Sequence, residues 1–228
     1  MLRHALMILT IAATFALTAS LVAADPNEAK TILTERGALI FADDLTQPPG
    51  QPWRVAKGEW KVVDGALQVK ELASDMHGAV ARRPLPQANF VVQYSVKLEG
   101  TKRTTLSIND AKGHCCRVLL DAAGLAVQKD SHDKGKIDKA AVLDKQAAPI
   151  AAGQWHTLVV EVLGSELVAS LDGKIVAFGS HDSINVAKKE VGLTVAGQSA
   201  SFKDLRVWEA KPNPTWEATK AALKKKRG

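Results

Sequence analysis

Residues 60–70 read WKVVDGALQVK, and residues 167–178 read LVASLDGKIVAF. Each stretch places the dipeptide Asp-Gly, at 64–65 and at 172–173, between two short apolar runs. Asp-Gly between such runs is the strongest short-range signal of a β-hairpin with a two-residue turn, because both turn residues must adopt positive φ. The two stretches therefore predict β-hairpins in a chain built from antiparallel strands.

Similar short segments recur on both sides of these hairpins. Further strands are predicted at 79–82, 90–98, 104–109, 115–121, 125–130, 156–163, 191–196 and 201–209. A helical pattern occurs only near the C-terminus, where Pro214 suits a first turn and Trp216, Lys220 and Leu223 share a face that we expect to pack on the strands. The sequence therefore predicts an all-β fold, a two-sheet antiparallel β-sandwich with a short C-terminal helix.

The N-terminus has the three parts of a secretory signal peptide. Arg3 precedes the apolar run 5–17, and Val22 and Ala24 fit a cleavage site before Asp25. The run is shorter than the roughly 20 residues of a transmembrane helix, which favours cleavage over a retained anchor. We expect an exported protein, periplasmic or extracellular after cleavage near Ala24. The expected parts are a signal peptide (1–24), a polar leader (25–37), a sandwich domain (38–209), and a short helix with a basic tail (210–228).

The net charge of +6 comes from the two ends of the chain. Arg3 leaves with the signal peptide, and five further basic residues lie among the last nine: Lys220, Lys224, Lys225, Lys226 and Arg227. Between 25 and 217 the chain carries 24 basic and 24 acidic residues. This balance argues against nucleic-acid binding by the domain. The tail is either simply solvated or makes weak contact with an anionic envelope surface.

The two cysteines, Cys115 and Cys116, are neighbours in a predicted strand. Adjacent strand residues point to opposite faces, so we expect one buried thiol and one on the other face. A vicinal or intermolecular disulfide is the alternative. A disulfide framework and a cysteine zinc site are both excluded by the number and spacing of these residues.

Period-two alternation gives each predicted strand one core face and one outward face. The core face is expected to hold Phe90, Val92, Tyr94, Val96, Leu98, Leu106, Ile108, Val118, Leu120, Leu125 and Val127. If these strands are neighbours in sequence order, the outward face brings together Lys97, Ser107, Asn109, Arg117, Gln128 and Asp130. Such a row of hydrogen-bonding groups could bind a sugar. The alternative is an ordinary solvent-exposed face, because an antiparallel sheet normally has one polar face in contact with water. No aromatic ring for stacking joins this predicted face.

The strongest chemical cluster is the hexapeptide 129–134, KDSHDK, which follows the polar face into a long loop (131–149). A histidine beside carboxylates can act as a general base near neutral pH, and a solvated charged turn is the alternative. His77 and His114 precede strands and are expected near the same rim. The predicted catalytic residues are Asp130, His132 and Arg117. The predicted substrate-binding residues are Lys97, Ser107, Asn109, His114, Gln128, Lys129 and Asp133.

Three aspartates are candidates for a structural calcium site. Asp43 and Asp44 follow the first strand, and Asp204 lies in the last one, so their oxygens would meet if these strands pair. The sequence has no Gly-rich phosphate loop, nucleophile elbow, His-Glu-x-x-His motif or zinc-spaced cysteine pair. We therefore expect no other cofactor and disfavour nucleotide-dependent chemistry, serine hydrolysis and zinc proteolysis.

Several segments together resemble a known family. They are IFADDL (40–45), WRVAKGEW (53–60), VDGAL (63–67), AGQWHTL (152–158), LDGK (171–174), VGL (191–193) and FKDLRV (202–207). Over residues 38–209 the chain resembles exported concanavalin A-like (laminin G-like) jelly rolls of the 3-keto-disaccharide hydrolase type. The segments TTLSIN (104–109) and Trp155-His156 replace the family's Asn-Ser-Gly strand and Trp-Asn pair.

The resemblance implies an exported bacterial protein of the planctomycete type that acts on carbohydrate. In that family the 3-keto group acidifies the neighbouring C2–H, so cleavage needs a base and an electrophilic stabiliser. We expect the polar face to bind a glycan or small glycoside, either as a binding module or as a hydrolase of a 3-keto glycoside. A non-catalytic structural or interaction module of the cell envelope is the alternative.

Overall fold

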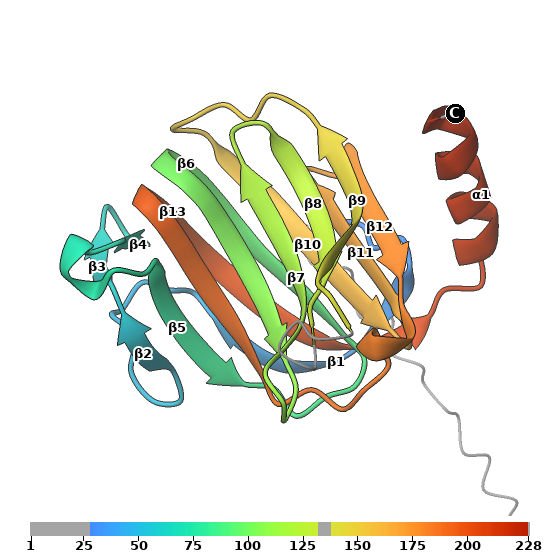
Figure 1. The fold of residues 1–228 in the computed structure, drawn as a ribbon, viewed down its shortest axis with the longest axis horizontal. Coiled ribbons are helices and arrows are strands. Elements are labelled where there is room, and N and C mark those ends of the chain that lie inside the picture. Colours follow the sequence, from blue (N-terminus) through green and yellow to red (C-terminus); the bar gives the residue numbers. More distant parts are fainter. Residues whose placement is uncertain (1–27, 132–137, 228) are drawn as a thin grey trace, which may run out of the picture.

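The computed structural model describes residues 28–131 and 138–227 (Figure 1). In this part of the chain thirteen strands pair into one antiparallel sheet that bends into two layers. The strands are β1 (Thr34–Asp43), β2 (Arg54–Lys57), β3 (Glu59–Val63), β4 (Ala66–Lys70), β5 (Ala79–Pro84), β6 (Phe90–Asn109), β7 (His114–Asp121), β8 (Gly124–Lys129), β9 (Ala141–Ala147), β10 (Trp155–Leu163), β11 (Glu166–Leu171), β12 (Ile175–Ser180) and β13 (Glu190–Pro212). Two short 3-10 helices, η1 (Ala73–Asp75) and η2 (Asp182–Ile184), and the helix α1 (Trp216–Arg227) complete the fold. The predicted all-β sandwich with a short C-terminal helix is confirmed.

Two long strands, β6 and β13, pair along their length and run through both layers (Figure 1). Their register shifts at Gly100 and Gly197, which have φ of 84° and 93°. A Cβ at these positions would lie 2.3 Å from Oε1 of Gln198 and 2.8 Å from the backbone nitrogen of Lys102, respectively. The positive φ favours glycine at both positions, and at Gly197 the nearby backbone also leaves no space for a side chain. The sequence predicts four separate strands here, at 90–98, 104–109, 191–196 and 201–209. The bend resembles a loop in each chain segment, because it contains Gly100 in one and Gly197 in the other.

The bend defines two sheets, each named here after one of its strands. The β7 sheet has the order β2, β5, first half of β13, second half of β6, β7, β8, β9. The β10 sheet contains the second half of β13, the first half of β6, β10, β11 and β12, with β4 and β1 pairing to β13 at its edge and β3 pairing to β4.

The core lies between the two sheets. All residues predicted for the core face from Phe90 to Val127 are buried, with at most 2% of their surface exposed. Tyr94 and Phe202 pack their rings in this core, with centroids 5.9 Å apart. The predicted core face is therefore confirmed for these residues of β6, β7 and β8.

Both predicted hairpins are present. Asp64 and Gly65 join β3 to β4 with φ of 50° and 71°, as a two-residue turn requires. Asp172 and Gly173 also have positive φ, 53° and 65°. In that hairpin Leu171 pairs with Ile175, so its loop also contains Lys174, one residue more than predicted.

The region predicted as one long loop, 131–149, contains the edge strand β9. β9 pairs only with β8 among the described strands. Most of its side chains are exposed, so it lacks the buried apolar alternation that marks the inner strands. The leader also differs from the prediction, because β1 begins at Thr34 within the expected 25–37 segment.

Both chain ends of the described part pack on the outer face of the β10 sheet. Leu33 and Trp216 form a small apolar cluster with Val168, Val176 and Phe178, and Leu223 packs against it. Figure 1 shows α1 beside β12, as the predicted packing of Trp216 and Leu223 requires. The predicted signal peptide (1–24) lies outside the described residues. Within the described ranges, no helix is long and apolar enough to cross a membrane.

The prediction that Cys115 and Cys116 lie on opposite faces is wrong, because both side chains are fully buried and free. Cys116 pairs with Ile108 and His114 pairs with Asn109, which leaves Cys115 as the extra residue of a β-bulge. The bulge cancels the alternation at this point. It also turns His114 toward Asn109.

Candidate functional site

Except for Lys97, the polar residues predicted for one face are brought together on the β7 sheet. Ser107 pairs with Arg117, and Arg117 pairs with Gln128 on the next strand. On the other side of β6 the same row continues through Gly192 to Arg82 of β5. Because residues in register on neighbouring strands share a face, these side chains form one continuous row.

A pocket of about 150 Å³ opens on this face. Its lining comes from four strands and the loop before β5 and is polar or charged except for Val80: His77, Val80, Arg82, Thr105, Ser107, His114, Arg117 and Thr194. His77 and His114 thus line the same pocket, while residues 132–134 of the predicted cluster lie outside the described part of the chain. Glycine at position 192 leaves room for this arrangement, since a Cβ there would lie 2.6 Å from Oγ of Ser107.

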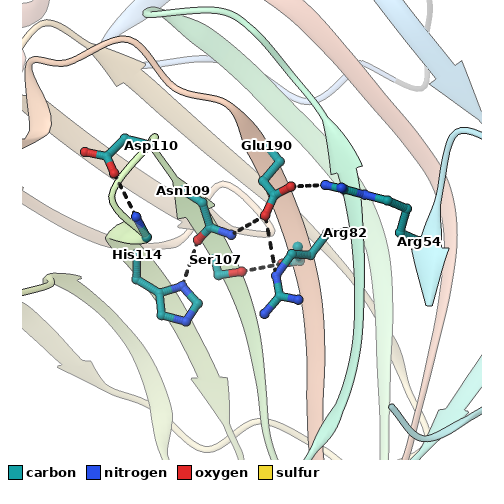
Figure 2. A network of polar contacts seen from close by, with 9 residues as sticks. Arg54, Arg82, Ser107, Asn109, Asp110, His114 and Glu190 are labelled. Carbon is teal, nitrogen blue, oxygen red and sulfur yellow. Dashed lines mark hydrogen bonds and ion pairs between the residues drawn. The ribbon is translucent and has the colours of Figure 1, made fainter. Parts of the chain in front are cut away.

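A chain of hydrogen bonds fixes the ring of His114 (Figure 2). Nδ2 of Asn109 donates to Oε1 of Glu190 at 3.1 Å, and Oδ1 of Asn109 lies 2.7 Å from Nδ1 of His114. A carboxylate only accepts, so the Asn109 amide must face Glu190 with its nitrogen and His114 with its oxygen. Nδ1 of His114 therefore carries the proton and donates it, which leaves the lone pair on Nε2.

The turn before β7 places His114 at this position. The Asp110 carboxylate accepts hydrogen bonds from the backbone N–H groups of Lys112 and Gly113, at 2.7 and 3.0 Å. Gly113 has φ of 137°, a conformation that L side chains rarely adopt. The sequence Asp-x-x-Gly thus closes a tight turn that leads directly into the bulge at Cys115.

The surroundings of His114 favour its neutral form. Burial lowers the pKa of His114 below its usual value of 6.5, and the positive charges of Arg117 and Arg82 lower it further. The carboxylates of Asp130 and Glu190 act in the opposite direction, but the net pKa shift is downward. The half-buried imidazole is therefore a base at neutral pH.

Arg117 is held by Asp130. Its Nε lies 3.0 Å from Oδ2 of Asp130, and the pair is an electrostatic contact rather than a well-directed hydrogen bond. Gln128 donates from Nε2 to the other oxygen of Asp130 at 3.0 Å. The Asp130 side chain is only 6% exposed. Both carboxylate oxygens thus face groups of the protein, and Asp130 orients Arg117 instead of facing the pocket as a free base.

A second hollow, of about 240 Å³, adjoins the pocket and shares Arg82 with it. Its lining is Arg54, Val55, Ala56, Arg82, Lys189 and Glu190. Glu190 forms ion pairs with Arg54 and, at 3.6 Å, with Arg82, and Figure 2 shows it between Asn109 and Arg54. Three cations and one carboxylate line this hollow, so it is net positive.

Some predicted site residues lie elsewhere. Lys97 is on the first half of β6, in the β10 sheet, where it pairs with Glu99 at 2.7 Å. The bend at Gly100 carries it away from Ser107. Lys129 is buried, lies in register with Cys116 instead of with Arg117, and forms an ion pair with Asp138. His132 and Asp133 lie outside the described residues.

The three candidate calcium ligands do not form a metal centre. Asp43 accepts hydrogen bonds from Nε1 of Trp53 at 2.8 Å and from the backbone of Leu45, and Asp44 caps Thr46. The terminal strands do pair as expected, Asp43 with Leu205. Nevertheless, no group of three or more His, Cys, Asp or Glu in the described ranges is arranged to hold a metal ion. The residues present therefore do not fit a calcium site.

Sequence reasoning missed Arg82, Glu190 and Arg54. Alternation in the segment 79–82 marks Arg82 as outward-facing once Ala79 and Ala81 are assigned to the core. Its neighbourhood depends on β13 lying between β5 and β6, a strand order that no local motif specifies. Glu190 enters the site for the same reason.

Comparison with solved structures found similar folds in carbohydrate-related proteins. One is the carbohydrate-binding module CBM66 from Bacillus subtilis, with a TM-score of 0.55, 17% identity, and coverage of 69% of this chain and 95% of that one. LamAcat from Zobellia galactanivorans has a TM-score of 0.56, 14% identity, and coverage of 75% and 97%. A GlcNAc[alpha]1-4Gal-releasing endo-[beta]-galactosidase from Clostridium perfringens has a TM-score of 0.58, 11% identity, and coverage of 81% and 65%. At these identities the likeness establishes the jelly-roll fold.

Comparison with curated proteins found no match. The family comparison is specific: the model of the 3-keto-alpha-glucoside-1,2-lyase-like domain matches residues 42–208. The matched region includes every described strand of the β7 sheet and all pocket residues. The chain thus belongs to the family of 3-keto-alpha-glucoside-1,2-lyase-like domains.

Proposed function

We propose that the pocket at His114 cleaves glycosides whose sugar carries a 3-keto group, by removing the proton at C2. The observation that carries this proposal is the chain Glu190–Asn109–His114, which leaves an unprotonated Nε2 on a ring that lines the pocket. Membership of the 3-keto-alpha-glucoside-1,2-lyase-like family supports this substrate class. The similar folds of a carbohydrate-binding module and a galactosidase support a saccharide ligand.

The chemistry needs a base and a stabiliser of negative charge. Nε2 of His114 takes the C2 proton, and the electrons of the C2–H bond pass to the keto oxygen as an enolate. Arg82 and Arg117 line the same pocket and supply positive charge to that oxygen. Each guanidinium group has several N–H donors and a delocalised positive charge, so it stabilises the enolate by hydrogen bonds and by charge.

Departure of the leaving group completes the step. The enolate electrons form a C1=C2 bond, the C3=O bond is restored, and the C1–O bond breaks with its electron pair on the leaving oxygen. That oxygen takes the proton from Nε2 of His114, which returns the imidazole to its neutral form. The product is an unsaturated 3-keto sugar, and addition of water across C1=C2 gives the overall hydrolysis.

The second hollow provides a place for the leaving group. It shares Arg82 with the pocket, so a disaccharide would lie across Arg82 with one ring on each side. The exposed side chain of Val55 offers an apolar contact there, and Arg54 and Lys189 offer hydrogen bonds to hydroxyl groups. We also propose that the predicted signal peptide (1–24) directs the protein, and with it this reaction, to the periplasm or beyond.

The test uses a 3-keto-α-glucoside and the matching unoxidised glucoside. We expect the purified protein to convert only the keto compound, with release of the leaving alcohol seen by NMR and a transient ultraviolet absorbance from the conjugated enone. His114→Ala and Arg117→Ala should each abolish conversion. His156→Ala is the matched control, because His156 lies in the β10 sheet bonded to Asp172 and should leave conversion intact.

Conversion of the unoxidised glucoside at the same rate, or full activity of His114→Ala, would contradict the proposal. Tight binding of the keto glucoside without any conversion would favour a binding module instead. Absence of both binding and conversion would favour the structural or interaction module of the envelope.

A further inference from the structure

The outer face of the β10 sheet carries a hollow of about 490 Å³, larger than the pocket at His114. Its lining is Glu28, Ala29, Gln93, Ser95, Trp155, Thr157, Lys203, Asp204 and Arg206. Because it lies on the other layer, none of its residues belongs to the proposed catalytic pocket.

The strand register explains why these side chains share one face. Thr157 of β10 pairs with Ser95 of β6, which pairs with Lys203 of β13. In the neighbouring row Trp155 pairs with Lys97. Hydroxyl and ammonium groups therefore stand beside an indole ring on a flat, rigid strand surface.

Trp155 is unusual among the aromatic residues of this chain. It is 38% exposed, whereas Trp53, Trp208 and Trp216 are at most 6% exposed. Within the described ranges no other aromatic side chain is as exposed. A partly exposed indole that lines a hollow presents an apolar ring face on which a ligand can stack.

The rest of this outer face is covered by the chain itself. Ala29 and Ala210 pack over Val91, Val159 and Trp208. Further along, α1 and Leu33 cover the face near Phe178. The fold thus covers the apolar part of this face and leaves the part around Trp155 open.

A ligand can displace the two lysine ammonium groups that lie near the Trp155 ring. Nζ of Lys97 lies 5.2 Å and Nζ of Lys203 4.6 Å from the Trp155 ring centroid. Lys97 is also held by Glu99 at 2.7 Å, and lysine side chains are long and flexible. A ligand with an apolar face can therefore displace these ammonium groups and hydrogen-bond to them at its rim.

We propose that Trp155 is the stacking platform of a second saccharide-binding site, for a pyranose ring within an oligosaccharide. The C–H face of the ring packs on the indole, and the equatorial hydroxyl groups bond to Ser95, Thr157 and Lys203. Such sites combine one apolar surface with a few convergent polar groups, which is the composition found here. The site would hold the protein on a glycan chain while the other layer acts on its own substrate, and it does not depend on catalysis at His114.

The test measures binding of maltohexaose, cellohexaose, laminarihexaose and xylohexaose to the purified protein by titration calorimetry and tryptophan fluorescence. We expect at least one of the four to bind, and Trp155→Ala to weaken its binding by about tenfold or more. Trp155→Phe keeps an aromatic ring and should stay within about threefold of the wild type. Thr157→Ala is a second, milder variant that should weaken the same ligand without removing the ring.

Two controls separate this site from the pocket and from the fold. His114→Ala should bind the hexasaccharide as the wild type does, whether or not the pocket proves catalytic. Each variant should keep the thermal unfolding midpoint of the wild type within a few degrees. Failure of all four probes to bind, or wild-type affinity in Trp155→Ala, would overturn the proposal.

Discussion

Asn109 holds His114 in one tautomer, because its Oδ1 lies 2.7 Å from Nδ1 of His114 while its Nδ2 bonds to Glu190 at 3.1 Å. The three residues come from the end of β6, the start of β7 and the start of β13. Glu190 can only accept a hydrogen bond, so the Asn109 amide must turn its NH2 group toward Glu190. Its oxygen then faces His114 and accepts the hydrogen bond of a protonated Nδ1. The position of a proton on β7 is thus set by a residue on β13.

Asn109→Asp tests this relationship. A carboxylate beside the imidazole should raise the pKa of His114, because the opposite charge stabilises the protonated ring. Proton-detected NMR of the His114 ring should show a higher titration midpoint, and kcat at neutral pH should fall as less base is available. Asn109→Leu, which removes both hydrogen bonds, should instead leave a mixture of the two neutral tautomers. An unchanged tautomer in Asn109→Leu would show that the amide does not set it.

Asp130→Asn should weaken turnover of a 3-keto glucoside by about tenfold or more, because Arg117 loses the charge that orients it. Arg117→Gln removes the partner, and the double variant should be little worse than Arg117→Gln alone. This non-additivity is measured by kcat/KM in a double-mutant cycle. Fully additive losses would mean that Asp130 acts on the substrate independently of Arg117.

The pH dependence of turnover should follow His114. Burial and the nearby arginines lower its pKa below 6.5, so the active neutral form persists until the pH falls below that value. The acid limb of the kcat/KM profile should therefore lie below pH 6.5. Asp130→Asn should move this limb to still lower pH, because Asp130 raises the pKa of His114. An acid limb above 6.5 would point to another base.

The same shift affects folding. The unfolded chain binds the His114 proton more tightly than the folded chain does, so the stability that neutral His114 contributes is present above pH 6.5. That contribution is lost as the pH falls through the lower pKa of the folded state. The free energy of unfolding can be measured by urea denaturation at a series of pH values from above 6.5 downward. As the pH is lowered, it should decrease more steeply for the wild type than for His114→Gln.

Glu161 holds the leader on the β10 sheet and offers a stability test. Its buried carboxylate accepts hydrogen bonds from Ile32 and from both the backbone and hydroxyl of Thr34, at 2.7 to 2.8 Å. Glu161→Ala should cost about 1–3 kcal/mol in the free energy of unfolding, because buried N–H groups lose their acceptor. Glu59→Ala, on β3, removes an exposed pair with Lys61 and should leave the free energy of unfolding close to that of the wild type. Equal losses would show that the leader contributes nothing through Glu161.

The basic end of α1 tests the proposed contact with an anionic envelope surface. Lys224, Lys225 and Lys226 are exposed on α1. Replacing all three by Glu should reduce sedimentation with vesicles of equal parts phosphatidylglycerol and phosphatidylcholine, since each basic residue near such a surface contributes about 1 kcal/mol. A control variant makes the same charge change at the exposed residues Lys70, Lys102 and Lys112. Equal binding by both variants would argue against α1 as the contact.

Much of the fold follows from two local sequence patterns, Asp-Gly turns and period-two alternation, that are clear in this chain. The Asp-Gly turns at Asp64 and Asp172 and the alternation from Phe90 to Leu98 identify hairpins and faces without any tertiary information. β9 escaped prediction because an edge strand buries too little to need alternation. The two bends at Gly100 and Gly197 looked like loops, because glycine marks a turn and a strand bend alike.

The site was predictable only in part. Ser107, Asn109, Arg117 and Gln128 lie on three strands that are consecutive in the chain, so period two alone places them on one face. Arg82 and Glu190 join them from segments far away in the sequence. The bulge at Cys115 is set by pairing between strands, so alternation alone assigned that residue to the wrong face.

The all-β class, the hairpins and the core faces follow from the spacing of neighbouring residues along single strands, and short motifs between 40 and 207 indicate the family. The packed fold adds that β13 lies between β5 and β6, that Glu190 orients Asn109, and that Trp155 stays open on the other layer. These relationships arise from strand order and register, which depend on the free energy of the whole packed sandwich and not on any one segment.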